Sequence, residues 1–136
     1  MKLLIINQLI YYETERDYGE MNQDKVVEFL RNFKQAASKR GVFVIPREST
    51  LSTLRQFGLT KMNLQDELLA LSLTNYSKGP EKDRDQNGEL WIFGKMVVRH
   101  EMYIKLKIFK VDGEYQAKCI SFHVAEYPLM YPFGEK

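Results

Sequence analysis

The sequence predicts an α+β domain in which N-terminal helices pack on an antiparallel β-meander. Apolar residues recur with a helical period up to about residue 73, and alternate with polar residues after about residue 89. The length of 136 residues is enough for one hydrophobic core, so we expect a single domain over residues 21–136. Residues 1–20 are expected to form either an N-terminal extension or an added edge strand.

The first helix is predicted to begin near Lys25. Asn22 or Asp24 can cap it, because a short side-chain oxygen accepts a hydrogen bond from a free N–H group of the first turn. Gly41 provides the left-handed residue that ends it. The residues expected on its buried stripe are Val26, Leu30, Phe33 and Ala37.

Three shorter elements are predicted between residues 42 and 73. Residues 42–45 are apolar and precede Pro46, which indicates a short buried strand. A second helix should open at Ser49 or Thr50 and end at Gly58. A third helix, capped by Asn63, should bury Leu64, Leu68 and Leu71.

The C-terminal half is predicted to be a meander. Residues 79–88 form a charged loop with turn residues at both ends, and strands follow at about residues 89–97, 102–110 and 115–123. The last two strands are joined at Asp112-Gly113. The tail, which contains Pro128 and Pro132, should lie extended over the body of the domain.

The register of the last two strands decides which side chains lie together. On the middle strand, one face carries Ile104 and Leu106, while the other carries Tyr103, Lys105, Lys107 and Phe109. A two-residue turn would place Ile120 and Phe122 on the lysine face, whereas a turn one residue longer would place them beside Ile104 and Leu106. We favour the longer turn because it buries more apolar area.

That register places His123 across from Tyr103, with Lys105 and Ser121 adjacent, on the face away from the core. A tyrosine or neutral histidine can act as a base, a protonated histidine or lysine can act as an acid, and lysine can stabilise phosphate charge. Such a set requires no metal. The alternative is that these lysines belong to an ordinary solvated face.

Several functional classes are disfavoured. The single cysteine, Cys119, excludes a disulfide framework and is expected to be an inert strand thiol. Residues 83–88 match the start of an EF-hand loop, but Gly94 stands where the closing glutamate is required. The apolar run at residues 3–10 is too short to cross a bilayer and has no cleavage site, so we expect a cytoplasmic protein without a membrane partner. The net charge of +2 does not by itself indicate a polyanionic partner.

An ordered set of segments resembles the motility quorum-sensing regulator (MqsR) family of toxins. The segments are Gly58-Leu59, residues 71–78, Trp91, residues 103–108 and residues 120–123. Residues 78–80, 91–95 and 118–123, with Tyr127-Pro128, are similar to a branch of that family with an extended C-terminal tail. The resemblance covers roughly residues 42–123.

The resemblance implies a RelE-like toxin fold and a metal-independent mRNA endoribonuclease without a cofactor, inhibited by a cognate antitoxin protein. By position, it implies catalytic roles for Lys78, Tyr103 and Lys105, and for His123 where the family usually has lysine. The strand glutamine of the family has no counterpart in residues 91–93. A groove for single-stranded mRNA would also use aromatic rings and cations, for which the candidates are Arg84, Trp91, Lys95 and Lys107.

The leading hypothesis from the sequence is therefore a toxin of a type II toxin–antitoxin system that cleaves mRNA by attack of a 2′-hydroxyl on the adjacent phosphate. The alternative is a non-catalytic RNA- or protein-binding module that retains the toxin fold. The apolar tail could also contact an antitoxin or a second copy of the chain.

Overall fold

The computed structural model describes residues 22–134, and the predicted extension at residues 1–20 lies outside them. The helices are α1 (Gln23–Arg40), α2 (Glu48–Phe57) and α3 (Lys61–Leu69), with a 3-10 turn, η2, at Leu73–Asn75. The strands are β2 (Val42–Val44), β3 (Tyr76–Lys82), β4 (Glu89–Val97), β5 (His100–Val111) and β6 (Glu114–Val124). No helix among the described residues is long and apolar enough to cross a membrane.

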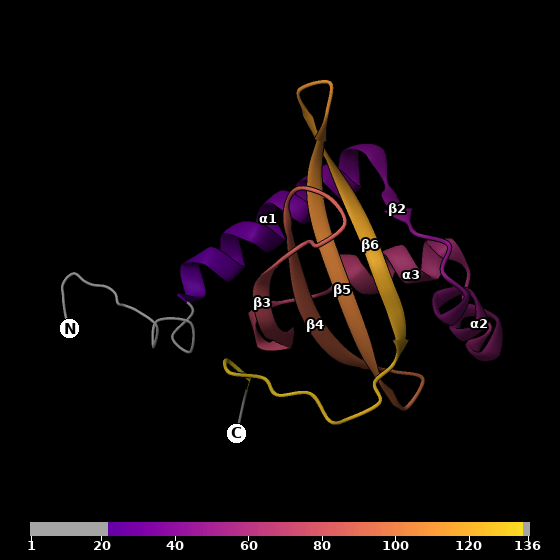
Figure 1. The fold of residues 1–136 in the computed structure, drawn as a ribbon. Coiled ribbons are helices and arrows are strands. Elements are labelled where there is room, and N and C mark those ends of the chain that lie inside the picture. Colours follow the sequence, from indigo (N-terminus) through magenta and orange to yellow (C-terminus); the bar gives the residue numbers. More distant parts are fainter. Residues whose placement is uncertain (1–21, 135–136) are drawn as a thin grey trace.

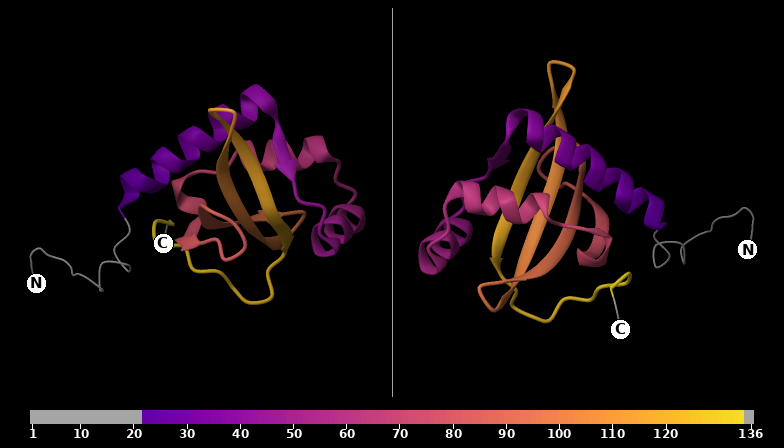
Figure 2. Two further views of the ribbon diagram at one scale, coloured as in Figure 1. Left: turned by 45° about the horizontal axis from the view of Figure 1, so that its top comes forward. Right: turned by 180° about the vertical axis from the view of Figure 1, so that it is seen from behind.

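The strands form one five-stranded sheet in the order β2-β6-β5-β4-β3 (Figure 1). Only β2 runs parallel to its neighbour, β6, and the other pairs are antiparallel. Helices α1 and α3 lie across one face of the sheet, and α2 lies beside β6 (Figure 2). The protein is therefore an α+β domain, as predicted. No helix within residues 22–134 covers the opposite face, and we call it the open face.

The sheet is larger than the predicted three-strand meander. Residues 76–82, of which 79–82 were expected to be loop, form the edge strand β3. Gly79 and Pro80 are tolerated there because an edge strand needs hydrogen bonds on one side only, and the β3–β4 register shifts between Lys78 and Glu81. The second addition, β2, pairs with β6 through Val42 to Val44.

Helix α1 confirms most of the prediction made for it. The Asn22 side chain accepts a hydrogen bond from the Asp24 N–H at 2.7 Å. Gly41 ends the helix with a positive φ of 77°, as expected, but its ψ of 178° lies outside the left-handed helical conformation that was predicted. The predicted stripe is buried, together with Phe29 and Ala36. This face forms the core with the sheet residues Trp91, Phe93, Ile104, Leu106 and Phe122.

Two local predictions need correction. Strand β2 is only half buried, because it is an edge strand and Phe43 is 52% exposed. Helix α3 is capped by Thr60 rather than Asn63. The Thr60 hydroxyl accepts from the Asn63 N–H and the Asn63 side chain accepts from the Thr60 N–H, both at 3.0 Å, which is a capping box with asparagine in the third helical position.

The β5–β6 connection is a two-residue turn, so the expected longer turn is wrong. Val111 pairs with Glu114 and Leu106 pairs with Cys119, as a two-residue turn requires. The register then shifts between Lys105 and Leu106, which leaves Ile120 as the extra residue of a β-bulge. Beyond the bulge, Ile104 pairs with Phe122 and Tyr103 with His123. The pairing of Tyr103 with His123 is therefore as predicted, but it results from the bulge and not from a longer turn.

The tail lies extended along the body, as predicted, and returns toward β3 (Figure 1). Its Phe133 ring stacks on Tyr76, with centroids 5.7 Å apart. Its start is hydrogen-bonded to the sheet through Ala125 N–H and the Glu101 carbonyl, at 2.8 Å. The Ala125 contact places the start of the tail at the border of the open face, two residues after His123.

Candidate functional site

The predicted catalytic residues come together on the open face. Lys78 on β3 pairs with Ile92 on β4, Ile92 pairs with Lys105 on β5, and Lys105 pairs with Ser121 on β6. Because paired residues point to the same side of a sheet, these four side chains form one row across it. Tyr103 and His123 form the next row, beside Gly94.

Tyr103 and His123 are stacked. Their ring centroids lie 5.1 Å apart with an interplanar angle of 15°, and the Lys105 Nζ lies 5.9 Å from the centroid of the Tyr103 ring. His123 Nδ1 lies 3.0 Å from the Val124 carbonyl oxygen. A carbonyl oxygen only accepts, so Nδ1 is assigned the proton and Nε2 of the neutral ring is left as an acceptor.

The phenol of Tyr103 is held in its protonated form. Burial raises its pKa above the ordinary value, and Glu81 acts in the same direction, while the positive charges of Lys78 and Arg47 oppose the shift. Since the net change is upward, Tyr103 keeps its proton at neutral pH and can donate it. The stacked pair therefore combines a proton donor with a nitrogen acceptor.

Arg47 is a further member of the site that the sequence analysis missed. It lies between β2 and α2, and its Nη1 donates a hydrogen bond to the Ser121 hydroxyl at 3.2 Å. Thr50, in the first turn of α2, accepts a hydrogen bond from the Phe122 N–H at 3.1 Å, which fixes the helix against β6. Because the parallel β2–β6 pairing was not predicted, nothing in the sequence brought Arg47 next to Ser121.

These side chains border an open depression of about 510 Å³. Its residues include Arg47, Lys78, Tyr103, Lys105 and His123, and the tail segment Ala125–Leu129 closes one side. Lys78 is exposed and its Nζ lies 3.5 Å from Glu81. The depression therefore carries three cations beside the stacked pair.

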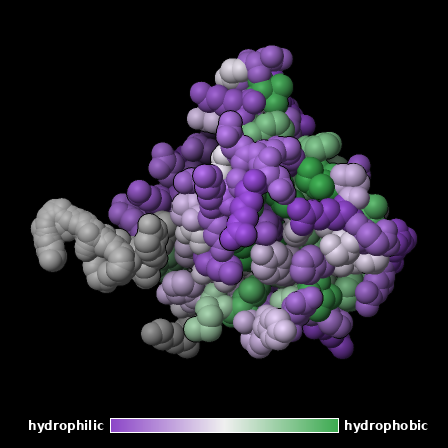
Figure 3. Space-filling model, viewed as in Figure 1, coloured by the Kyte–Doolittle hydropathy of each residue, from purple (hydrophilic) through white to green (hydrophobic). Residues whose placement is uncertain are grey.

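A second depression of about 440 Å³ adjoins the first, and Arg47 and Lys105 border both. It also contains the predicted RNA-contacting residue Arg84, together with Lys82 and Lys118. Its carboxylates are Glu81, Asp83 and Asp85. Hydrophilic residues cover the middle of the open face (Figure 3).

Lys107 does not belong to this surface. It projects from the open face but is 1% exposed, because the 83–88 loop covers it. Its Nζ lies 2.6 Å from the Asp83 Oδ2, and this hydrogen bond lowers the pKa of the Asp83 carboxyl to about 2. The expected RNA contact of Lys107 is replaced by a buried ion pair that fastens the loop.

Trp91 and Lys95 also lie away from the open face. Both point to the core side of β4, where Trp91 is 7% exposed and stacks on Phe29 with centroids 4.7 Å apart. The Lys95 Nζ lies 2.7 Å from a Glu67 oxygen on α3. Neither side chain is available for the RNA contact expected from the sequence, since β4 alternation turns both toward the helices.

Cys119 matches the prediction of an inert thiol. It is fully buried, and burial raises its pKa to about 12. A thiol with that pKa holds almost no thiolate at neutral pH, so it is a weak nucleophile.

No family model, no curated protein and no solved structure matches this chain.

Proposed function

We propose that this protein is a metal-independent endoribonuclease that cleaves single-stranded mRNA. The observation that carries the proposal is the stacked Tyr103–His123 pair, which borders one depression with Arg47, Lys78 and Lys105. A proton donor, a nitrogen acceptor and a group of cations are the components that phosphodiester transfer requires.

The reaction is attack of a ribose 2′-hydroxyl on the adjacent phosphorus. His123 Nε2 takes the 2′-hydroxyl proton, and the new bond from O2′ to phosphorus forms as the bond to the leaving 5′-oxygen breaks. Tyr103, which holds its proton at neutral pH, donates to that oxygen. The products are a 2′,3′-cyclic phosphate and a 5′-hydroxyl, with no water or cofactor consumed.

The cations stabilise the charge that develops on the phosphoryl oxygens. Arg47 offers a planar donor fork, and Lys105 and Lys78 offer point charges from the two neighbouring strands. Arg47 and Lys105 border both depressions, so a phosphate held by them has room for one neighbouring nucleotide in each.

The wider role in this proposal is that of a cytoplasmic toxin with a RelE-like fold, inhibited by a cognate antitoxin. Its support is the resemblance of residues 42–123 to the MqsR toxins, together with the meeting of Lys78, Tyr103, Lys105 and His123 at one depression. Induced expression should then arrest bacterial growth, and co-expression of the antitoxin should restore it.

The direct test is incubation of purified protein with an unstructured RNA in EDTA. We expect cleavage that leaves cyclic phosphate ends, and a loss of about 100- to 10,000-fold in Tyr103→Phe and His123→Gln. Matched controls are Tyr115→Phe and His100→Gln, since both residues are exposed and neither borders the depression. These controls should cleave like the wild type.

Equal activity of Tyr103→Phe and Tyr115→Phe would refute the site. Tight RNA binding without cleavage, alone and with ribosomes, would favour the non-catalytic binding module instead. Folding of each variant is checked by its urea unfolding midpoint, which should not change for either site variant because Tyr103 and His123 lie off the core.

A further inference from the structure

The Glu101 side chain on β5 fastens the middle of the C-terminal strap, residues 125–134, to the sheet. Both carboxylate oxygens of Glu101 are used, one accepting from the Leu129 N–H at 3.3 Å and the other from the Tyr131 hydroxyl at 2.5 Å. Burial and the contact with Glu101 raise the pKa of Tyr131, so its hydroxyl stays a donor. The strap therefore has a defined path.

The sheet also leaves space for the strap at Gly94. A Cβ atom at this position would lie 2.4 Å from both the Leu129 Cδ1 and the Tyr131 hydroxyl oxygen. Any larger residue would push the strap away from the sheet. Further along, the stack of Phe133 on Tyr76 holds the end of the strap, with an interplanar angle of 23°.

Between the fixed positions Ala125 and Leu129, the strap borders the depression. Tyr127 lies in the middle of this segment and is 78% exposed, although it borders the same depression as Tyr103 and His123. Neither the core nor the anchors of the strap use its ring. An exposed aromatic ring beside cations is the arrangement by which proteins stack the bases of single-stranded RNA.

We propose that Tyr127 stacks on the nucleobase next to the scissile phosphate and that Glu101 positions it by fastening the strap. This inference rests on the proposed function and adds the residue that recognises the base. Glu126, the neighbouring carboxylate at the depression, repels phosphate and keeps the backbone of the RNA on the Arg47 and Lys105 side.

The test measures binding rather than cleavage. The probe is a fluorescent six-nucleotide 2′-O-methyl oligouridylate, which lacks the attacking hydroxyl, and its Kd is measured by anisotropy. Tyr127→Ala should weaken binding by about 5- to 150-fold, and Tyr127→Phe should retain wild-type affinity. Tyr115→Ala, at a half-exposed tyrosine outside the depression, is the matched control and should bind normally.

A series of probes with one abasic position each locates the contact. At one abasic position, the wild type should bind more weakly. Its Kd for that probe should then equal the Kd of Tyr127→Ala, because the base that Tyr127 contacts is missing. Glu101→Ala should reproduce the loss, and adding Tyr127→Ala to it should cause little more. On cleavable RNA, Tyr127→Ala should raise KM and leave kcat nearly unchanged.

The outcomes separate this inference from the proposed function. The stacking role would be overturned if Tyr127→Ala bound the probe as tightly as the wild type, or if Tyr127→Phe bound it as weakly as Tyr127→Ala. Neither result would contradict cleavage of RNA by the wild type. The expected pattern of base-dependent binding without any cleavage would instead refute the nuclease and retain the stacking role. Absence of binding by the wild type would overturn both.

Discussion

Lys105 and Lys107 lie two residues apart on β5 and point to the same face of the sheet, but their surroundings differ. Lys105 borders both depressions. Lys107 is buried under the 83–88 loop against Asp83, with a separation of 2.6 Å. The same alternation of lysines thus yields a candidate phosphate ligand at one position and a structural ion pair at the next.

The difference is caused by what covers each lysine. The Asp83 carboxylate also accepts hydrogen bonds from the Asp85 and Gln86 N–H groups at 2.9 and 3.2 Å, so the loop is folded around the group that pairs with Lys107. In the part of the chain that the structure describes, no comparable loop covers Lys105. A buried charge requires a partner, whereas an open cation beside a depression is available to a ligand.

The largest effect is expected from breaking the buried pair. Asp83→Asn leaves the Lys107 ammonium buried without its counter-charge, and the free energy of unfolding should fall by about 3 to 5 kcal/mol, measured by urea titration. The double variant Asp83→Asn/Lys107→Met should recover most of this loss, because both charges are then gone. A loss below about 1 kcal/mol in the single variant would show that the pair is solvated.

The second prediction removes the charge of Lys105, the lysine that borders the two depressions. Lys105→Met keeps the aliphatic stem but removes the charge, so RNA cleavage should fall by about 100- to 1,000-fold with an unchanged unfolding midpoint. Lys110→Met, an equal charge change at an exposed position of β5, is the control. Cleavage that is lost equally in both variants would assign Lys105 a general electrostatic role only.

The alternation of apolar and polar residues and the helix-capping residues are enough to predict part of the fold from the sequence. They place α1 and its buried stripe and the three strands after residue 89. They fail where long-range pairing decides. Strand β3 contains Gly79 and Pro80 and reads as a loop, and β2 joins the sheet by a parallel pairing that no local pattern marks.

The candidate site was predictable to the same extent. The residues carried by β5 and β6 follow from alternation, but Arg47 depends on the β2–β6 pairing and was missed. Trp91, Lys95 and Lys107 were misplaced because residue type alone does not show which side of β4 faces the helices or where a loop folds back. The Tyr103–His123 register was reached through a wrong turn length, since the bulge at Ile120 was not expected.

The bulge gives a third prediction. Deletion of Ile120 should preserve the fold, because Cys119 and Ser121 already pair with consecutive residues of β5, and His123 stays opposite Tyr103. The cost should be about 1.5 to 3 kcal/mol for the lost burial of one isoleucine, read from urea unfolding. Deletion of Ile104, which has no compensating bulge on its own strand, is the control and should prevent folding.

The fourth prediction concerns acid. The Asp83 pKa is about 2, below its ordinary value of 3.8, because of its hydrogen bond with Lys107. The ionised Asp83 carboxylate therefore stabilises the folded state above pH 3.8, and this stabilisation is lost as the pH falls toward 2. The shift corresponds to about 2 kcal/mol. The stability difference between wild type and Asp83→Asn should therefore shrink by this amount between pH 5 and pH 2, while a difference that stays constant would contradict the shift.

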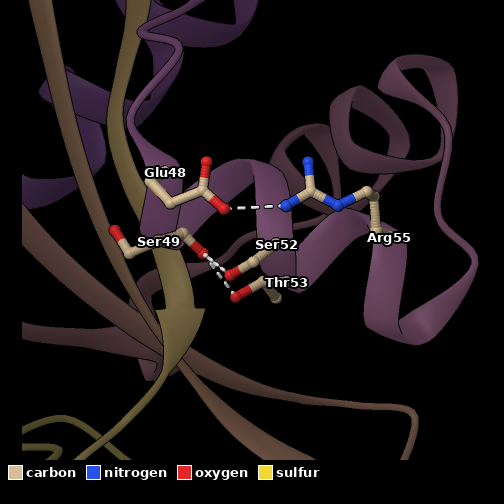
Figure 4. A network of polar contacts seen from close by, with 5 residues as sticks. All are labelled: Glu48, Ser49, Ser52, Thr53 and Arg55. Atoms are coloured by element: carbon tan, nitrogen blue, oxygen red, sulfur yellow. Dashed lines mark hydrogen bonds and ion pairs between the residues drawn. The ribbon is translucent and has the colours of Figure 1, made fainter.

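The smallest effect is expected at an ion pair that the solvent reaches. The Glu48 and Arg55 side chains on α2 are 2.7 Å apart but 77% and 64% exposed, beside the hydrogen bonds that Ser52 and Thr53 donate to the Ser49 carbonyl (Figure 4). Solvent screens such a pair, so Glu48→Gln should cost less than about 1 kcal/mol in urea unfolding. Its distance nearly equals that of the Asp83–Lys107 pair, and burial is what separates the two. A loss comparable to that of Asp83→Asn would mean that distance rather than burial sets the strength of ion pairs in this protein.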